Sequence, residues 1–313
     1  MSSSGGRKPA PLRPAADVRG IATERENPRS SELDQRSALE IARIINAEDR
    51  TVPEAVSKAL PQIARAIEAI AKAFQSGGRL IYVGTGTSGR LGALDASECP
   101  PTFNADPRMV QYVIAGGERA LSRAVEASED SKPLGKSDLR KKRPTNKDVV
   151  CGLAASGRTP YTIAALEYAR SKGATTICVT ANPMSPMVVA ADIPIAIDVG
   201  PEVVAGSTRM KAGTMQKLVL NMLTTGAFTR IGYVYRNLMV NVHLKNRKLL
   251  ERGIGIVQET TGLGRKAAVE LLREAGGSVP TAIVMHVTGS TRRQAEKKLK
   301  QAGGNVRQAI GGL

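Results

Sequence analysis

The chain has 313 residues and a formal net charge of +17. Its 42% hydrophobic content suffices for a sizeable core, and three cysteines without a CxxC spacing exclude a framework of paired disulfides. No stretch approaches the roughly 18 consecutive apolar residues of a membrane span, and the N-terminus lacks an apolar signal region. We therefore expect a soluble, cytoplasmic protein without membrane partners.

The N-terminal part begins with a Pro- and Ser-rich stretch, residues 1–20, which predicts a disordered tail. Two helical patterns follow. The first covers 37–49 with Ser37 as its N-cap, and the second covers 52–78 and ends on a pair of glycines. We take these helices as the beginning of a domain that spans 21–245.

From residue 79 onward, short β-branched runs alternate with helical stretches. The expected strands cover 79–86, 109–117, 148–156, 175–182 and 192–199. The expected helices cover 88–98, 120–130, 159–173 and 210–232. Pro100 and Pro101 are expected to stop the first of these helices. This order predicts an α/β fold with a doubly wound parallel sheet and helices on both faces.

After about residue 246 the strand signals stop. Helical stretches are expected near 264–275, 279–287, 291–302 and 304–310. We therefore predict a small all-α subdomain over 246–313.

The basic residues are scattered rather than gathered into one patch. They occur in the tail, in a segment read as a loop over 131–148, and in the helices around 292–300. No aromatic residues interleave with them, as stacking on single-stranded nucleic acid requires. A solvated basic surface is the preferred interpretation, and we expect no nucleic-acid partner.

Two predicted strand ends carry the same kind of loop. Ligands of open parallel sheets bind beyond the carboxyl ends of the strands, where glycines, hydroxyls and helix N-termini can hold a phosphate. The candidate phosphate ligands are Thr85, Thr87 and Ser88 in the first loop and Ser156, Arg158 and Thr159 in the second. The alternative for each loop alone is a Gly-rich turn with capping hydroxyls. No GxxxxGK[ST] motif is present, so a nucleotide triphosphate is disfavoured.

A third segment, 200–214, enters the long helix expected over 210–232. Ser207 is a natural N-cap, whereas Arg209 and Lys211 place positive charge at a helix start, where the macrodipole disfavours cations. A bound anion would remove this conflict. We therefore add Ser207, Arg209 and Lys211 to the predicted substrate-binding residues.

Four motifs make this chain similar to a known family. They are LDASECPPTF (94–103), AVEASEDS (124–131), AASGRTPY (154–161) and GPEVVAGSTRMKAGTMQK (200–217). With them the chain resembles the N-acetylmuramic acid 6-phosphate etherases, which have the sugar isomerase (SIS) fold and are related to the glucokinase regulatory protein. The resemblance runs from about Glu24 to the C-terminus.

The resemblance implies a homodimer that acts in cell-wall recycling and forms N-acetylglucosamine 6-phosphate and D-lactate. It also implies two catalytic glutamates, which map by motif onto Glu98 and Glu129.

Two carboxylates suit the cleavage of a lactyl ether. In the open-chain sugar the carbonyl acidifies the proton on carbon 2, and the lactyl oxygen on carbon 3 is then a leaving group. Glu98, flanked by Ala, Cys and Pro, is expected to be shielded from water and to protonate that oxygen, while Glu129, at the end of the helix expected over 120–130, activates the water that adds. Which of the two removes the carbon-2 proton stays open.

We expect no metal and no cofactor. His243 and His286 sit apart on apolar stretches without clustered acidic residues. Three alternatives remain beside the etherase: a sugar-phosphate isomerase, a non-catalytic sugar-phosphate-binding regulator, and a DNA-binding regulator, for which residues 1–36 are too short and polar to form a helix-turn-helix.

Overall fold

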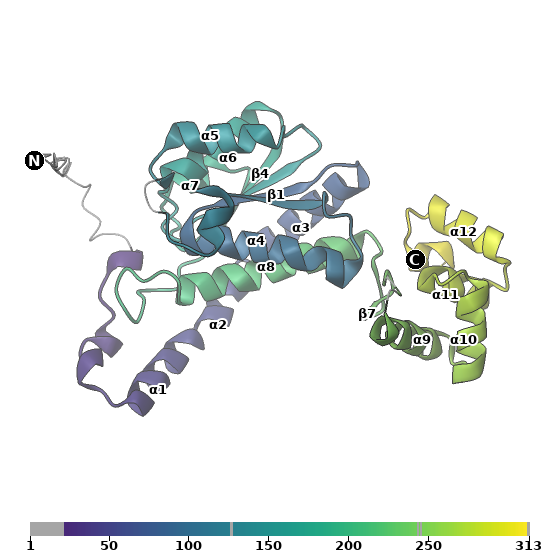
Figure 1. Cartoon of the computed structure of the whole chain (residues 1–313). Helices are drawn as coiled ribbons and strands as arrows, with labels where there is room; N and C mark the ends of the chain where they lie inside the picture. The colour runs from purple at the N-terminus through teal and green to yellow at the C-terminus, as the bar shows by residue number, and fades with distance from the viewer. Residues whose placement is uncertain (1–21, 126–127, 243, 245, 312–313) are drawn as a thin grey trace, which may run out of the picture.

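The computed structural model describes residues 22–311 except 126–127, 243 and 245, and it has the expected α/β architecture (Figure 1). At its centre lies a five-stranded sheet with the order β2-β1-β3-β4-β5, in which every neighbouring pair is parallel. The strands are β1 (Leu80–Gly84), β2 (Val110–Ile114), β3 (Val149–Leu153), β4 (Thr175–Thr180) and β5 (Ile193–Ala196). They are short, largely buried and rich in branched residues, as strands between two helical layers require.

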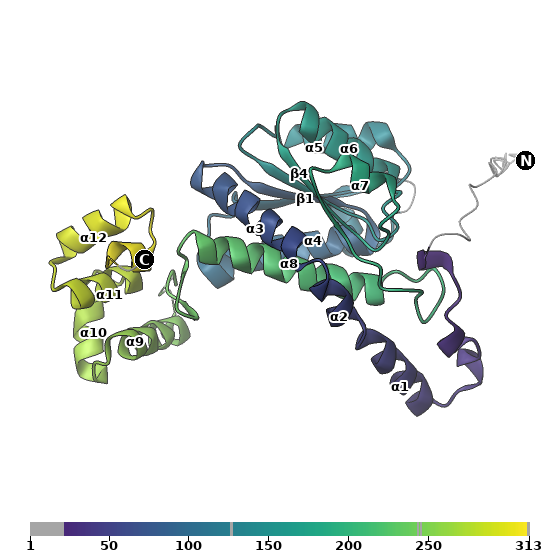
Figure 2. The same cartoon turned by 180° about the vertical axis from the view of Figure 1, so that it is seen from behind.

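Helices cover both faces of this sheet (Figures 1 and 2). One layer consists of α3 (Leu60–Gln75), α4 (Gly86–Phe103) and α8 (Lys211–Arg230), and the other of α5 (Lys132–Lys141), α6 (Pro160–Ser171) and α7 (Pro186–Ala190). Side chains of β1 alternate between the two cores: Leu80 and Tyr82 pack with the first layer, Ile81 and Val83 with the second. The sheet is therefore doubly wound, as predicted.

The strand order creates a switch point between β1 and β3. Gly84 at the end of β1 pairs in register with Leu153 at the end of β3, so the two following loops start side by side. In sheets with this order, ligands bind in the crevice outside the strand ends at the switch point. The fold thus brings together the first and second predicted phosphate loops.

The N-terminal helices differ from the prediction in one respect. The start of α1 (Ala38–Asp49) is confirmed, because Ser37 caps it in a reciprocal capping box with Glu40. The expected helix over 52–78 is instead two helices, α2 (Val52–Ser57) and α3. Pro61 lies in the first turn of α3, where its missing N–H costs nothing. In both views α1 extends away from the body of the molecule (Figures 1 and 2).

Helix α4 is longer than expected. It continues through Pro100 and Pro101 to Phe103, so the prediction that these prolines stop it is wrong. Phe103 is buried and stacks on Phe228 of α8 with ring centroids 4.6 Å apart. Packing of this last turn therefore compensates for the loss of the backbone hydrogen bonds that the prolines cannot form. The helix ends at Asn104, which has a left-handed φ of 52°.

The predictions for 120–130 and 131–148 are both wrong. The described part of 120–130 forms the end of a 3-10 helix and turns, whereas the segment read as a basic loop contains α5. Ser131 caps this helix by accepting a hydrogen bond from the Leu134 N–H. Glu129 therefore lies in a turn just before a helix and not at a helix end.

The C-terminal region contains the four expected helices and three further elements. Its elements are the antiparallel pair β6 (Val234–Tyr235) and β7 (Leu238–Met239), followed by α9 (Arg247–Thr261), α10 (Arg265–Glu274), α11 (Val279–Thr288), α12 (Arg292–Gln301) and α13 (Val306–Ala309). The β6–β7 pair and α9 were not predicted, and neither was α7. These helices share a hydrophobic core of their own and lie to one side of the sheet (Figure 1). The predicted boundary at 245 stays a prediction, and residues 1–20 lie outside the described part.

The remaining elements are short 3-10 helices. They are η1 (Ala22–Glu24), η2 (Pro28–Ser30), η3 (Leu33–Gln35) and η4 (Gly117–Leu121). The segment containing η1 and η2 lies against the third predicted loop, because Gly206 N–H donates to the Thr23 carbonyl and the Ser30 hydroxyl to the Val203 carbonyl. The N-terminal segment thus fixes a loop that lies far away in the sequence.

Candidate active site

The first phosphate loop turns sharply from β1 into α4. A Cβ at Gly84 would lie 2.9 Å from the backbone nitrogen of Gly89, so only glycine allows this approach. Gly86 has a left-handed φ of 49°. Thr85 is the buried N-cap, and among the described residues its hydroxyl bonds to no helix N–H. The N–H groups of the first turn of α4 are therefore placed to bind an anion at the switch point.

The other two hydroxyls of this loop face α8. The Ser88 hydroxyl donates to Gln216 Oε1 at 2.9 Å, and both side chains are buried. Thr87 is half-buried, and its Cγ2 would lie 3.8 Å from a Cβ at Gly213. Ser88 thus joins α4 to α8. Thr85 and Thr87 remain the candidate phosphate ligands of this loop.

The second loop is held from behind by side chains that follow β4. Thr180 Oγ1 donates to the Ala155 carbonyl, and Asn182 Nδ2 donates to the Ser156 carbonyl, both at 3.1 Å. Gly157 has a φ of 63°, and the space that a Cβ would need there is filled by Ser185. The loop conformation is therefore fixed before any ligand binds.

Polar groups of the second loop gather at its front. The Arg158 N–H donates to the Ser156 hydroxyl at 3.3 Å, and the Arg158 side chain is exposed. Thr159 is the N-cap of α6 with an extended backbone. Ser156, Arg158 and Thr159 therefore stand together beside the switch point, and their role as phosphate ligands stays a prediction.

In the third loop, carboxylates of the protein itself bind the start of α8 and the Lys211 ammonium. Glu202, 1% exposed, accepts hydrogen bonds from the N–H groups of Lys211 and Ala212, both at 2.9 Å. The Lys211 ammonium is also buried, and it donates to Glu48 Oε2 at 2.6 Å. The position before α8 is occupied by Met210 and not by a hydroxyl residue. A carboxylate thus caps α8 in place of the expected Ser207.

These buried carboxylates differ in their surroundings. Burial pulls the pKa of Glu48 upward, but hydrogen bonds from Lys211, Asn27 and Arg29 outweigh it and hold that pKa below its usual range. Burial raises the pKa of Glu202, and the two α8 N–H groups only partly offset the rise.

The conflict between the helix dipole and Lys211 is therefore resolved by Glu48 and Glu202. The inference of a bound anion at Lys211 is not needed, and the ammonium is committed to Glu48 in this arrangement. Arg209 is exposed and Ser207 half-buried, and their substrate-binding role stays a prediction. No local sequence pattern around Lys211 predicts that its partner is Glu48, which lies 163 residues away in the sequence.

Glu129 lies at the first phosphate loop. A Cβ at Gly86 would be 3.4 Å from Glu129 Oε1, which places this carboxylate at the N-terminus of α4. The Glu129 carbonyl accepts a hydrogen bond from the Tyr161 N–H at 3.1 Å, and this bond fixes the turn to the start of α6. Glu129 thus stands between the first and second loops.

Glu98 lies on the same helix as Gly86 but twelve residues further along. At about 1.5 Å per residue, the two backbone positions are roughly 18 Å apart. Glu98 is exposed, so the expectation that its neighbours shield it from water is wrong for the single chain. The reason is helical periodicity: Asp95 and Cys99 point into the core, and Glu98 points out. Glu98 and Glu129 of one chain therefore do not share a pocket.

A buried carboxylate one turn before Glu98 escaped the sequence analysis. Asp95 accepts hydrogen bonds from the Tyr82 hydroxyl at 2.9 Å and the Thr224 hydroxyl at 3.3 Å. It joins α4 to β1 and α8. Burial raises the pKa of Asp95 to about 6, and the Tyr82 hydroxyl, the charge of Lys217 and the Thr224 hydroxyl only partly offset the rise.

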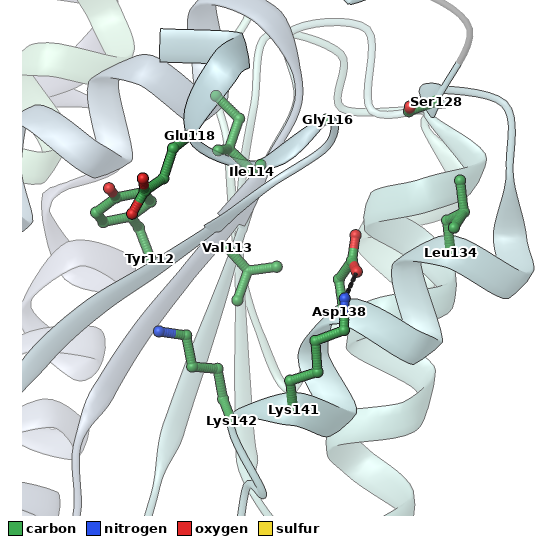
Figure 3. Close-up of a pocket in the computed structure, with 11 residues that line it drawn as sticks. Tyr112, Val113, Ile114, Gly116, Glu118, Ser128, Leu134, Asp138, Lys141 and Lys142 are labelled. Carbon is green, nitrogen blue, oxygen red and sulfur yellow. Dashed lines mark hydrogen bonds and ion pairs between the residues drawn. The ribbon is translucent and has the colours of Figure 1, made fainter.

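A cavity adjoins the Glu129 turn (Figure 3). It has a volume of about 510 Å³ and lies between the edge strand β2 and α5. Val113 and Leu134 contribute apolar surface, Lys141 and Lys142 stand at one end, and Ser128 stands at the other. Its lining comes from β2, α5 and the connecting segments. The cavity therefore lies beside the candidate site, and none of the candidate phosphate ligands lines it.

No group of three or more His, Cys, Asp and Glu side chains in the described part of the chain is arranged to hold a metal ion. None of its helices is both long and apolar enough to cross a membrane.

The fold and its loops define an SIS domain. Residues 62–170 match the family model of the glucokinase regulatory protein N-terminal SIS domain, and residues 139–226 match the SIS domain model. A phosphoheptose isomerase from Neisseria gonorrhoeae is similar in structure, with a TM-score of 0.49 and 15% identity over 62% of this chain and 100% of that one.

Two proteins similar in sequence show which family of SIS-domain proteins the chain belongs to. An N-acetylmuramic acid 6-phosphate etherase from Actinobacillus pleuropneumoniae is 54% identical over 264 residues, 84% of this chain and 87% of that protein. One from Symbiobacterium thermophilum is 55% identical over 269 residues, 86% of this chain and 89% of that protein. The chain belongs to the N-acetylmuramic acid 6-phosphate etherase family.

Proposed function

We propose that the protein cleaves the D-lactyl ether of N-acetylmuramic acid 6-phosphate, giving N-acetylglucosamine 6-phosphate and D-lactate. The observation that carries this proposal is the position of Glu129, whose carboxylate lies at the N-terminus of α4 between two phosphate-type loops. The family relationship supports the same activity over most of the chain.

The loops bind the substrate at a distance from the reacting bond. Thr85, Thr87, Ser156, Arg158 and Thr159 hold the phosphate together with the N–H groups at the starts of α4 and α6. Ser207 and Arg209 approach from the third loop, and Ser88 acts through Gln216 by fixing α4 against α8. Binding energy from the phosphate thus orients the ether.

The reaction is an elimination followed by an addition. A base removes the carbon-2 proton, the electron pair forms a double bond between carbons 2 and 3, and the bond from carbon 3 to the lactyl oxygen breaks as Glu98 protonates that oxygen. Water activated by Glu129 then adds to carbon 3, and carbon 2 regains a proton. The scheme uses no metal and no cofactor.

We infer that the site is completed by a second copy of the chain. Because Glu98 and Glu129 of one chain are separated by roughly 18 Å of helix, they can act on one sugar only if they come from different subunits. Leu94, 44% exposed and one turn from Glu98, and an apolar hollow between α3 and α8 give this face the surface that a dimer interface buries. A cytoplasmic location stays a prediction.

The activity is tested by incubating the protein with N-acetylmuramic acid 6-phosphate in ¹⁸O-labelled water. We expect release of D-lactate without label and one ¹⁸O at carbon 3 of the sugar. An isomerase releases no lactate, and label in the lactate would contradict elimination and addition.

Glu98→Gln and Glu129→Gln test the two carboxylates. We expect each to lower lactate release by about 10²–10⁴-fold while sugar-phosphate binding, measured by calorimetry, stays nearly unchanged. Glu54→Gln on the exposed surface of α2 is the matched control. Full turnover in either site variant would remove that residue from the mechanism.

A further inference from the structure

Helix α1 has an apolar stripe that its own chain covers only in part. Of its twelve residues, all of them described, Glu48 alone is buried, and it lies in the last turn. Ile41, Ile44 and Ile45 precede Glu48 on the same side of the helix, at the i, i+3, i+4 and i+7 spacing of a packing face, and all three are half-buried. A helix of this length is marginally stable alone in water. We therefore expect the stripe to pack against a further surface in the assembled protein.

The body of the same chain has an uncovered apolar hollow. It lies between α3 and α8 and has a volume of about 520 Å³. Its lining is mostly apolar and includes Leu60, Ala64 and Ile67 of α3 and Met222 of α8. Leu60 is 47% exposed, Ala64 is exposed, and Ile67 and Met222 are half-buried. A contiguous apolar surface of this kind marks an interaction site.

Helix α1 does not reach the hollow of its own chain. Its last turn is fixed at the start of α8, where Lys211 donates to Glu48 at 2.6 Å. Met222 lies eleven residues further along α8, which is roughly 16 Å of helix. From Glu48, α1 extends away from the body of the molecule in both views (Figures 1 and 2). The stripe and the hollow of one chain therefore stay apart.

The hollow is continuous with the face that carries Glu98. Helix α8 meets α4 where the Thr224 hydroxyl donates to Asp95, one turn before Glu98. Met222 in the hollow is two residues from Thr224, and Leu94 and Glu98 are exposed on the outer side of α4. A second chain that approaches Glu98 thus also faces the hollow.

We propose that α1 of one chain packs into the α3–α8 hollow of a second copy, and that the second copy makes the same contact in return. Because both surfaces belong to one chain, a two-fold dimer forms the contact twice and covers both of them. Their chemistry matches, since the isoleucines of the stripe meet a mostly apolar lining. The inference rests on the two-chain site proposed above and names the contact that assembles it.

This contact links assembly to the third loop. Glu48 of α1 binds Lys211 at the start of α8. The same carboxylate accepts a hydrogen bond from Asn27 Nδ2 at 2.9 Å, and Asn27 Nδ2 also donates to the Pro201 carbonyl at 3.2 Å. A subunit that holds its partner's α1 therefore also holds the third loop of that partner in place.

Two aspartate substitutions test the contact through the mass of the full chain in sedimentation equilibrium. Ile44→Asp on the stripe and Ala64→Asp in the hollow each place a charge in an apolar contact, so we expect each to lower the mass from two chains to one. Leu39→Asp is the matched control, because Leu39 is 59% exposed on the other side of α1 and its substitution should leave the dimer intact. Circular dichroism of each variant, expected to match the unchanged chain, reports that it folds.

A cross-link shows which chain supplies α1. The native thiols of Cys99, Cys151 and Cys178 are buried and should not react. In the double variant Ile44→Cys with Ala64→Cys, a bifunctional maleimide should join two chains into a species of twice the chain mass, which neither single variant forms. A link within one chain, with both new thiols consumed and the mass unchanged, would contradict the exchange of α1.

The sedimentation results decide the inference without reference to activity. A dimer that persists in both Ile44→Asp and Ala64→Asp overturns it, and so does a dimer that is lost in Leu39→Asp but kept in Ile44→Asp. Lactate release tests the proposed function separately. A persistent dimer that releases lactate leaves the etherase activity standing without this contact, whereas single chains of Ile44→Asp that still release lactate support the contact and contradict the two-chain site.

Discussion

The second and third loops look alike in sequence, since both combine glycine, hydroxyls and arginine at a helix start, yet they are built differently. In the second loop, the Ser156 carbonyl accepts a hydrogen bond from Asn182 Nδ2, and Thr159 is the N-cap of α6. In the third loop, the charge at the start of α8 is compensated inside the protein by Glu48 and Glu202.

The difference shows that a cation at a helix start does not by itself indicate a ligand. Lys211 is buried, and a buried charge requires a partner. That partner is a carboxylate of α1, whereas the second loop has no comparable internal anion among the residues that its hydrogen bonds involve. Substitutions should therefore affect stability at the third loop and substrate affinity at the second.

The largest effect is expected for Glu48→Ala. It leaves the Lys211 ammonium buried without its carboxylate, which costs about 3–5 kcal/mol of the free energy of unfolding. Urea unfolding measures this loss, and Glu54→Ala on exposed α2 should change stability by less than about 0.5 kcal/mol.

A double substitution, Glu48→Leu with Lys211→Met, should recover most of the stability, because it removes both charges. A loss below about 1 kcal/mol in Glu48→Ala would mean that Lys211 reaches water, and the contrast between the two loops would disappear.

A smaller effect is expected for Asp95, whose pKa is raised by burial. Its pKa is about 6 in the folded chain and 3.8 when unperturbed, so the folded protein holds a proton that the unfolded chain releases between pH 4 and 6. Stability from this group is therefore lost as pH rises through that window, by about 3 kcal/mol in total.

Asp95→Asn keeps an acceptor for the Tyr82 hydroxyl but does not titrate. The unfolding free energy of this variant relative to the unchanged chain should thus be higher at pH 7 than at pH 4. A difference that is constant with pH would contradict a raised pKa of Asp95 in the folded chain.

The smallest effect is expected at the second loop. Ser156→Ala combined with Thr159→Ala removes two hydroxyls that bond to a charged phosphate, and KM should rise about 10- to 100-fold with kcat little changed. The unfolding free energy should stay within about 1 kcal/mol, since neither side chain is part of the core. An unchanged KM would place the phosphate elsewhere.

The sequence predicted the local parts of this molecule better than the long-range ones. Alternation of branched runs and helical stretches predicted the five strands, and Ser37 as an N-cap predicted the start of α1. Local signals gave the wrong helix end where tertiary packing determines it. The prolines in α4 predicted its end, but the helix continues because Phe103 packs on Phe228.

The site was predicted in part for the same reason. The positions of the loop glycines follow from local geometry, and they were found. The partners of Lys211 and the exposure of Glu98 depend on elements far away in the sequence or on helix orientation, and no local pattern announced them.

The pairing of Glu98 and Glu129 across two subunits is tested most directly by mixing two inactive variants. Glu98→Gln and Glu129→Gln chains, unfolded together and refolded in equal amounts, give about half mixed dimers, each with one intact site out of two. We expect lactate release to return to about one quarter of the unchanged activity. If the two glutamates act within one chain, every site in the mixture lacks one carboxylate, and activity would stay at the level of the separate variants.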